Sequence, residues 1–319
     1  MFLVYFLCEE EKRYIFRGLL SRVRSDPIDD SLRGWSWDRP PLEPPYDGIR
    51  LGVYEIAVRE CGSMRDVYLR HVERVRGVPN KRMVRGGVLH EVVENVILNA
   101  KIILYSGSSP CGSEVFDELC GRMDDCVSRI GGKWRKFAMN AGYSEEEYED
   151  LLGCAKSLWR YEASQISASV DRILAKHPYI SLDALVNTAI PVVVEQRLDG
   201  RFLGLSSNLS ADALGFAPVV LDLKTGEFRS WQYMSTTGYA LVLEALNEAP
   251  IDVGVLVNLS FLGSKPRISR YPHLVDTSLR MRFLEIRDEL MELIASGRDP
   301  GAPRRCPEDC PYYNVCRGE

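Results

Sequence analysis

The stretch Pro218–Gly226 reads Pro-Val-Val-Leu-Asp-Leu-Lys-Thr-Gly, which predicts an apolar β-strand that carries two opposite charges. Side chains alternate along a strand, so Asp222 and Lys224 point to the same face, while the valines and leucines lie in or near the core. A carboxylate here can hold a divalent metal on a phosphate, and an ammonium can orient the attacking water or stabilise developing charge. The pattern indicates hydrolytic phosphodiester chemistry. The alternative is a salt-bridged strand end that runs into a turn.

Further strands and helices surround this stretch in the sequence. Residues 190–198, 202–213, 251–261 and 266–271 also have the β-branched and apolar content of strands. Gly215 predicts a hairpin between 202–213 and 217–224, which brings Asp212 back against Asp222. Helical patterns cover residues 229–247 and 276–296. We therefore expect an α/β fold, with helices on a mixed sheet.

Residues 51–177 are dominated by helical patterns. Gly86 and Gly87 predict the start of a helix with His90 in its second turn, and a packed or surface histidine is the alternative to a metal ligand. Ser144 followed by three glutamates predicts a capping box at the start of a long helix. The proline-rich residues 38–48 predict a linker between an N-terminal arm and the body.

Composition limits the class of protein. The 319 residues are 45% hydrophobic and 27% charged, enough to bury a sizeable core. No apolar run approaches the ~20 residues that span a bilayer, and the first residues make a poor signal peptide, so we expect a cytoplasmic protein without membrane contact. Nine cysteines in clusters favour a cofactor plus spare buried thiols over a disulfide framework.

The charge is unevenly placed along the chain. A net charge of -5 argues against indiscriminate nucleic-acid binding. Between residues 65 and 85, however, the chain has seven lysines and arginines and only two acidic residues, Asp66 and Glu73. This run, with Arg82 and Arg85 nearest the predicted histidine helix, can form a wall that follows a DNA backbone. A solvated helix face is the alternative.

Three cysteines, Cys306, Cys310 and Cys316, lie within eleven residues beside prolines near the end of the chain. This spacing suits a metal or cluster loop better than a packed core, and a fourth ligand must come from elsewhere.

The order of these features carries a family resemblance. His90, then Asp212, then the Asp222-Leu223-Lys224 strand, then a helix with Tyr239 and a terminal cysteine trio resembles the RecB-like branch of the PD-(D/E)XK nucleases. Within that branch the chain is similar to the CRISPR-associated exonucleases called "Cas four", in their longer archaeal-type variant. The resemblance covers residues from about 50 to 319.

The resemblance implies roles for individual residues. The metal ligands it implies are His90, Asp212, Asp222 and the carbonyl oxygen of Leu223, and an imidazole among them favours manganese while tolerating magnesium. Lys224 matches the catalytic lysine, whose task is to orient or help deprotonate the water or to stabilise the pentavalent state. Glu195 matches an acid that reaches the site through water, with a plain edge-strand carboxylate as the alternative.

Two positions depart from the family pattern. Ala211 precedes Asp212, where an isoleucine or valine is usual. Tyr239 matches the family's helical tyrosine, but Ser235 stands four residues before it in place of a glutamine. Gln232 lies seven residues before Tyr239 and shares its helix face, so it can reach a different part of the DNA.

The resemblance also implies an iron–sulfur cluster, in which a cysteine ahead of the histidine helix joins the terminal three. Cys61 matches that position. Structural zinc is the competing occupant, but zinc loops favour two close Cys-x-x-Cys pairs, whereas this chain has one isolated cysteine and spacings of three and five. Both a 2Fe-2S and a 4Fe-4S cluster remain open.

Together these features imply a metal-dependent DNA exonuclease with a PD-(D/E)XK core. It is expected to act on single-stranded ends or overhangs and to trim spacer precursors alongside the CRISPR integrase and other adaptation proteins. The alternatives are a RecB-like repair nuclease that works with a helicase, and a non-catalytic subunit that binds DNA ends. The expected domains are an arm and linker over 1–50, a helical region over 51–180, the nuclease core over 181–300 and the cluster segment over 301–319.

Overall fold

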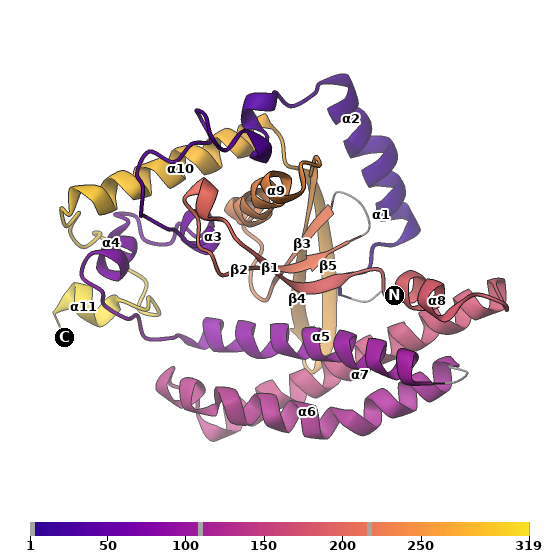
Figure 1. Ribbon diagram of the computed structural model, residues 1–319. Coiled ribbons are helices and arrows are strands. Elements are labelled where there is room, and N and C mark those ends of the chain that lie inside the picture. The colour runs from indigo at the N-terminus through magenta and orange to yellow at the C-terminus, as the bar shows by residue number, and fades with distance from the viewer. Residues whose placement is uncertain (1–3, 108–110, 216–218, 319) are drawn as a thin grey trace.

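The computed structural model describes residues 4–107, 111–215 and 219–318. Five strands form one mixed sheet that stands between helical layers (Figure 1). In sheet order they are β1 (Val193–Leu198), β2 (Leu209–Leu214), β3 (Val219–Lys224), β4 (Val253–Leu262) and β5 (Lys265–Leu274). The predicted α/β class with a mixed sheet is confirmed. Within the described ranges, no helix is both long and apolar enough to cross a membrane.

The connections explain why the sheet is mixed. β1, β2 and β3 pair antiparallel in chain order, as do β4 and β5. β3 and β4 pair in parallel, because the helix α9 (Tyr233–Asn247) carries the chain back between them. The predicted hairpin is confirmed, with Ala213 opposite Leu221, although residues 216–218 of its connection lie outside the described residues.

The predicted strand 202–213 is wrong over its first half. Arg201–Leu203 form a 3₁₀ turn, and the strand begins only at Leu209. Gly204 has φ of 70°, a left-handed conformation that an extended strand does not use, and a Cβ there would lie 2.2 Å from the Met291 side chain. A turn packed tightly against a helix therefore replaces the expected extended chain.

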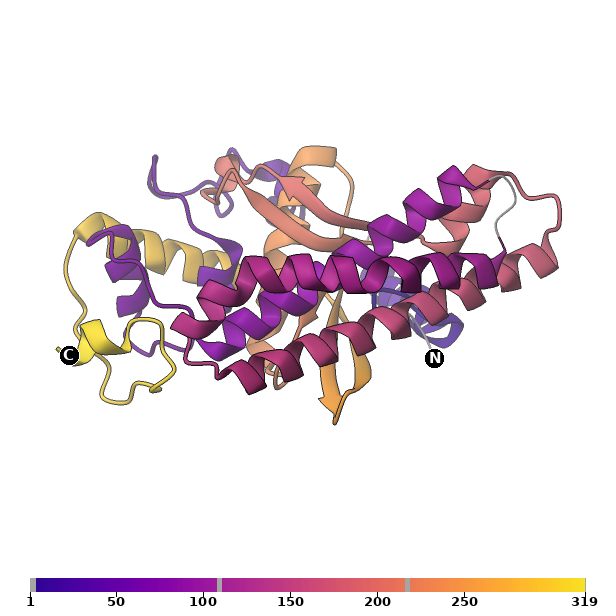
Figure 2. The ribbon, with the colours of Figure 1, turned by 90° about the horizontal axis from the view of Figure 1, so that it is seen from below.

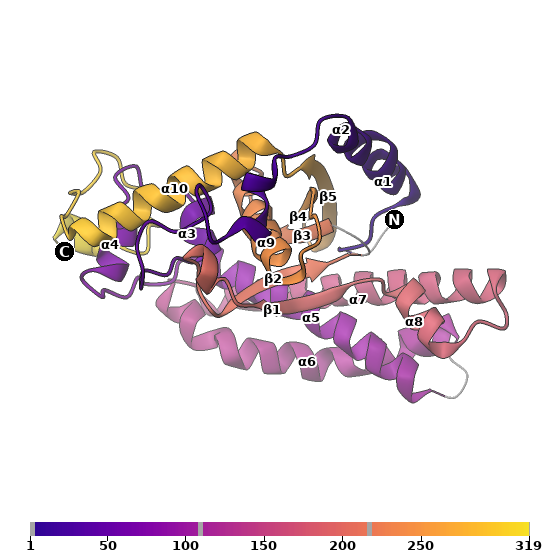
Figure 3. The same cartoon turned by 45° about the horizontal axis from the view of Figure 1, so that its top comes forward.

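One face of the sheet carries α9, α10 (Thr277–Ser296) and the short α3 (Val53–Ala57) (Figure 3). The N-terminal arm packs into this layer. Buried Arg33 donates to Glu244 of α9 over 2.7 Å, and buried Arg287 of α10 donates to the carbonyl of Leu42 over 2.6 Å. Residues 38–48 contain no helix or strand, as predicted, but they lie against α10 instead of separating the arm from the body. The domain boundaries stay predictions.

The other face is covered by a long helical layer (Figure 2). Its members are α5 (Lys81–Ser106), α6 (Gly112–Asn140), α7 (Glu145–Lys176) and α8 (Leu182–Ala189). The predicted capping box is confirmed, because the Ser144 side chain accepts from the N–H of Glu147 while the Glu147 carboxylate accepts from the N–H of Ser144.

Helix α5 starts earlier than the glycine pair predicts. Asn80 caps it by accepting from the N–H of Met83 over 2.8 Å, so His90 lies in the third turn instead of the second. Gly87 lies inside the helix, where a Cβ would be 2.1 Å from the ring of Trp134 in α6. The glycine therefore serves close packing between two helices and does not mark a helix start.

The remaining elements come from both ends of the chain. Before α3 lie α1 (Glu9–Arg13), a π-helical turn (Tyr14–Leu19), α2 (Leu20–Ser25) and two 3₁₀ turns at Asp30–Leu32 and Gly34–Ser36. The short α4 (Arg65–His71) packs beside α11 (Tyr313–Arg317), and a 3₁₀ turn at Ser230–Gln232 precedes α9. All nine cysteines are free thiols.

Candidate active site

A cluster of metal-ligating side chains forms where β1, β2 and α5 meet. One ligand atom each of His90, Glu195 and Asp212 lies within 4.8 Å of the others. The Nδ1 atom of His90 is 3.5 Å from Oδ1 of Asp212. The three residues come from three different elements, so the tertiary fold builds this cluster.

Strands β2 and β3 separate at this cluster. Among the described residues their ladder contains two residue pairs, and next to Ala213 the side chain of Asp212 bonds the backbone of β3. Its Oδ2 accepts a hydrogen bond from the main-chain N–H of Leu223 over 2.7 Å. This contact fixes the Asp212 carboxylate beside Asp222, as the hairpin predicts. The expected role of the Leu223 carbonyl oxygen as a ligand stays a prediction.

Glu195 has an unusual backbone. The strand register continues on both sides of it, with Val194 opposite Ala213 and Gln196 opposite Ala211. Glu195 itself has φ of 50°, a left-handed conformation that costs a non-glycine residue roughly 1–2 kcal/mol. Its Oε2 accepts from the Ser210 hydroxyl over 2.6 Å. Such strain concentrates at functional sites, and here it accompanies a carboxylate within the ligand cluster.

Asp222 and Lys224 point to the same side, as the strand pattern predicts. The Nζ of Lys224 is 2.7 Å from Oδ2 of Asp222, and Asp222 is only 4% exposed. Although the two charges touch, this oxygen accepts no hydrogen bond of good geometry within the described part of the chain. A buried carboxylate oxygen in this state is available to a further ligand.

Burial and charge act against each other in the cluster. Burial raises the pKa of Asp222 to about 6 against the opposing charge of Lys224, and the charge of Asp212 adds to the rise. Burial disfavours the charged form of Lys224, but Asp222 and Asp212 outweigh it and raise the pKa of the ammonium. Burial likewise opposes charge on His90 and Asp212, yet their mutual attraction raises the histidine pKa and lowers that of the carboxyl.

The donor set fits a divalent cation. It offers one imidazole nitrogen, several carboxylate oxygens and the unsatisfied oxygen of Asp222. Mixed nitrogen and oxygen ligands suit manganese and tolerate magnesium.

Tyr239 of α9 lies near the same carboxylates. Burial raises the pKa of its phenol, and the charges of Asp222, Asp212 and Glu195 raise it further. Gln232, by contrast, supports the turn before α9: its Oε1 accepts from the N–H of Arg229 over 3.1 Å.

The two basic residues predicted to bind DNA already have protein contacts. The guanidinium of Arg82 pairs with Glu60 over 3.1 Å and with Asp309 over 2.7 Å. The guanidinium of Arg85 lies over the ring of Phe261, 5.2 Å from its centre. A DNA backbone would therefore compete with these contacts.

The four predicted cluster cysteines lie in two segments that pack together. The N–H of Val78 donates to the carbonyl of Pro311 over 2.9 Å, and the side chain of Asn80 donates to the carbonyl of Asp309 over 2.7 Å. Burial raises the pKa of the Cys310 thiol to about 12, and the nearby thiols of Cys306 and Cys61 contribute to the rise. For Cys316, burial raises the pKa and the same two thiols add to it. The fold thus gathers Cys61, Cys306, Cys310 and Cys316.

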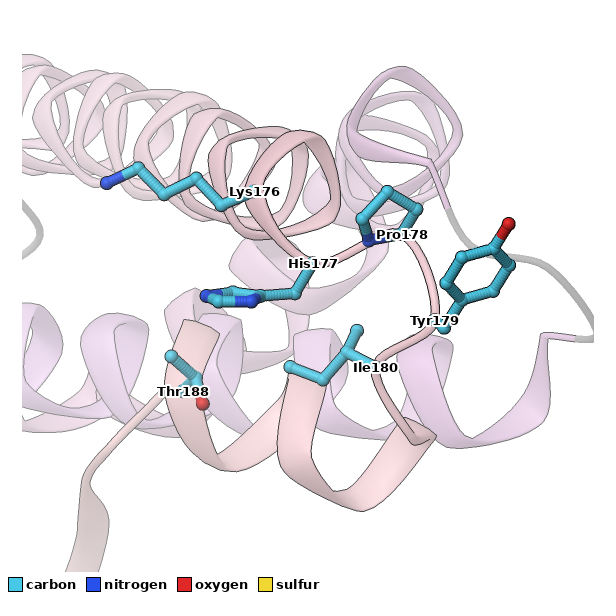
Figure 4. Close-up of a pocket in the computed structure, with 6 residues that line it drawn as sticks. All are labelled: Lys176, His177, Pro178, Tyr179, Ile180 and Thr188. Atoms are coloured by element: carbon cyan, nitrogen blue, oxygen red, sulfur yellow. The ribbon is translucent and has the colours of Figure 1, made fainter.

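An open pocket of about 560 Å³ lies at the turn between α7 and α8 (Figure 4). Its lining residues are Lys176, His177, Pro178, Tyr179, Ile180 and Thr188. None belongs to the carboxylate cluster, so the pocket is separate from the candidate active site.

Sequence reasoning did not single out Tyr5. This residue is 4% exposed, burial raises the pKa of its phenol, and the charges of Asp212, Asp222 and Glu195 raise it further. No motif marks it, because it lies 190 or more residues before these carboxylates.

The sequence of this chain matches a known protein family. The family model of the CRISPR-associated exonuclease Csa1 matches residues 5–319, and so includes the arm. Curated relatives described as CRISPR-associated exonuclease Csa1 occur in Saccharolobus solfataricus and Thermoproteus tenax. The first is 30% identical over 304 residues, which cover 93% of this chain and 96% of the relative. The second is 32% identical over 303 residues, which cover 93% and 95%.

No solved structure matches significantly. The matches confirm the recognition of a CRISPR-associated exonuclease from the sequence. The chain belongs to the family of the CRISPR-associated exonuclease Csa1.

Proposed function

We propose that the chain is a metal-dependent DNA exonuclease whose active site is the cluster around Asp222. The observation that carries this proposal is a buried, unsatisfied carboxylate oxygen beside a lysine, next to three further ligands within 4.8 Å of one another. A purely structural ion pair does not require a histidine and two more acids. The names of the relatives support exonuclease activity.

Each residue has a task in phosphodiester hydrolysis. His90, Glu195, Asp212 and Asp222 would hold the divalent cation, which supplies Lewis-acid stabilisation of the phosphate charge when bound. Lys224 keeps its positive charge because Asp222 and Asp212 raise its pKa, so it can orient the attacking water and stabilise charge that develops on the phosphate. Tyr239 keeps its proton because its pKa is raised, so it can donate a hydrogen bond to the substrate.

We assign the core to the RecB-like branch of the PD-(D/E)XK nucleases. The support is the order of elements: Asp212 on β2, Asp222 and Lys224 on the next strand of the hairpin, then a helix with Tyr239.

We also propose that the four gathered cysteines hold an iron–sulfur cluster. One isolated cysteine and spacings of three and five residues fit such a cluster better than zinc, whose loops favour two close Cys-x-x-Cys pairs. The cluster would clamp residues near 61 to those near 310.

The proposed substrate is a single-stranded DNA end or overhang, because a buried site must receive an unpaired strand. The CRISPR-associated names of the relatives support a role in trimming spacer precursors, with the integrase as partner. A repair nuclease that works with a helicase is the second candidate.

The experiment compares cleavage of end-labelled single strands and blunt duplexes of one sequence, with manganese, magnesium or a chelator. We expect manganese-dependent shortening of the single strand, slower cutting of the duplex and no cutting with chelator. Equal rates on both DNAs would contradict the substrate assignment, and full activity in chelator would contradict the metal assignment. The matched control protein is Lys224→Met, which keeps the length of the side chain and removes its charge.

A further inference from the structure

The β4–β5 hairpin extends beyond the end of the strand that carries Lys224. The pairing of β3 with β4 ends where Lys224 lies opposite Asn258, and β4 continues for four more residues to Leu262. After a two-residue turn, β5 returns antiparallel from Lys265. Gly263 in this turn has φ of 59°, and a Cβ there would meet nothing within 4 Å. Figure 2 shows the orange tip of the hairpin projecting past the neighbouring helices. The tip is therefore open to solvent.

The strand register places one face of this extension in line with the catalytic strand. Lys224 is paired with Asn258, so alternation along β4 puts every second residue after Asn258 on the face that carries Lys224. Residues directly opposite one another on β5 share that face. The four exposed residues that result, called the hairpin face below, are Ser260, Leu262, Lys265 and Arg267.

The opposite face of the hairpin is packed. Leu259 belongs to the core beneath the long helical layer, and the partly buried Phe261 and Ile268 pack against that core. The guanidinium of Arg85 on α5 lies over the ring of Phe261, 5.2 Å from its centre. These contacts hold the hairpin against the body and leave the hairpin face on the open side.

The hairpin face is positively charged. Residues 258–269 contain two cations, Lys265 and Arg267, and no acidic residue. Both cations are exposed, and neither side chain forms an ion pair with another described residue. The loop after Lys224 adds one acid and one cation, Glu227 and Arg229, which pair with each other over 3.9 Å. Two positive charges on this face are therefore available to an anion from outside the protein.

The spacing of the two cations suits a nucleic-acid backbone. Arg267 and Lys265 lie opposite positions two and four residues beyond Asn258. At about 3.3 Å per residue, they follow the level of Lys224 by roughly 7 and 13 Å. Phosphates along one stacked strand recur about every 3.4 Å. A strand whose scissile phosphate lies at Lys224 can thus bring its next few phosphates to both cations.

We propose that the hairpin face binds the DNA strand whose end enters the nuclease centre. Arg267 and Lys265 each bind a phosphate, and Leu262, which is 59% exposed at the tip, lies against an unpaired base. Proteins that hold single strands combine cations along the backbone with side chains that pack on base faces. The inference rests on the proposed nuclease function and adds the path that the strand follows outside the centre.

The first test is the double variant Lys265→Gln with Arg267→Gln. Its affinity for a labelled single strand is measured by fluorescence anisotropy in calcium over a series of salt concentrations. We expect the affinity to fall by about 10-fold, because two charge-assisted contacts are lost. The slope of log affinity against log salt should become shallower by about 1.4, which is about 0.7 for each lost phosphate contact. The matched control, Arg172→Gln with Lys176→Gln, removes the same two residue types from exposed positions on α7 and should bind as wild type does.

The second test is Leu262→Ser, which removes an apolar contact and no charge. We expect a lower affinity for the same single strand with the salt slope of wild type. Wild-type affinity in this variant would overturn the base contact.

The outcomes separate this inference from the proposed function. The p-nitrophenyl ester of thymidine monophosphate has one phosphodiester and no further phosphate, so the double hairpin variant should cut it with manganese at the wild-type rate. A lower rate would show that the hairpin supports the centre itself and would overturn the inference. So would an unchanged salt slope in the hairpin variant, or an equal loss of affinity in the α7 control. A wild-type protein that binds the strand but cuts neither substrate contradicts the nuclease function, and the salt slopes then still decide whether the hairpin face contacts DNA.

Discussion

Glu162 provides a prediction about stability and pH. The residue lies on α7 with no exposed surface. Its Oε1 accepts from the N–H of Val4, while Oε2 accepts no hydrogen bond within the described residues. Burial raises the pKa of this carboxyl from 4.5 to about 8, against the opposing hydrogen bond from Val4 and the charge of Arg270. The folded protein therefore binds a proton at Glu162 that the unfolded chain has released at neutral pH.

The sign of the effect follows from linkage. Between the unfolded pKa near 4.5 and the folded pKa near 8, the folded state holds more protons, so stability falls as the pH rises. Each pH unit changes the free energy of unfolding by about 1.36 kcal/mol, so the full interval lowers it by at most about 5 kcal/mol. In Glu162→Gln the side chain carries no charge at any pH, and its oxygen can still accept from Val4. We therefore expect this variant to lose the part of the pH dependence of its stability that comes from Glu162.

The assay is urea unfolding of wild type and Glu162→Gln at several pH values from 5 to 8. We expect the stability of the variant relative to wild type to increase over this range by a few kcal/mol. Glu146→Gln, an exposed change on the same helix, is the control and should follow wild type at every pH. If the free energies of unfolding of wild type and Glu162→Gln changed in parallel with pH, the assignment of a protonated, buried carboxyl would be refuted.

Three further predictions concern the cysteines, the histidine and the basic residues. Cys310→Ala should lose the iron and the brown colour of anaerobically purified protein and melt at a lower temperature, while any folded fraction retains metal-dependent cleavage; colourless wild-type protein with stoichiometric zinc would contradict this. His90→Ala should bind manganese more weakly in calorimetry, and an unchanged affinity would make His90 a packing residue. Charge reversal at Arg82 and Arg85 should lower DNA affinity and the slope of affinity against salt; an unchanged slope would assign both to the protein contacts they make with Glu60, Asp309 and Phe261.

Local sequence patterns predict the strands, helix caps and hairpins that depend on neighbouring residues. The apolar alternation of β3 places Asp222 and Lys224 together, and the cap at Ser144 sets the start of α7. The return of β2 against β3 follows from the short connection at Gly215. In each case the deciding contacts join residues close in sequence.

Features that depend on distant residues could not be predicted in this way. Gly87 allows close packing against Trp134, which lies forty-seven positions later in the sequence. Because the local sequence does not reveal this contact, the glycine resembles the start of a helix. The left-handed backbone of Glu195 has no local sign, because non-glycine residues rarely adopt it. The position of Cys61 follows only from the family resemblance, because no local pattern links this cysteine to the three near residue 310.

The central claim is that the cluster around Asp222 cuts DNA with a divalent cation. The most direct measurement is the single-turnover rate of manganese-dependent cleavage of an end-labelled single strand by wild type and Asp222→Asn. Calorimetric manganese binding and thermal unfolding of both proteins accompany it, and Asp183→Asn serves as an exposed control on α8. We predict a rate at least ~100-fold lower and weaker manganese binding in Asp222→Asn, with its fold intact. Wild-type cleavage and manganese affinity in a folded Asp222→Asn protein would contradict the account.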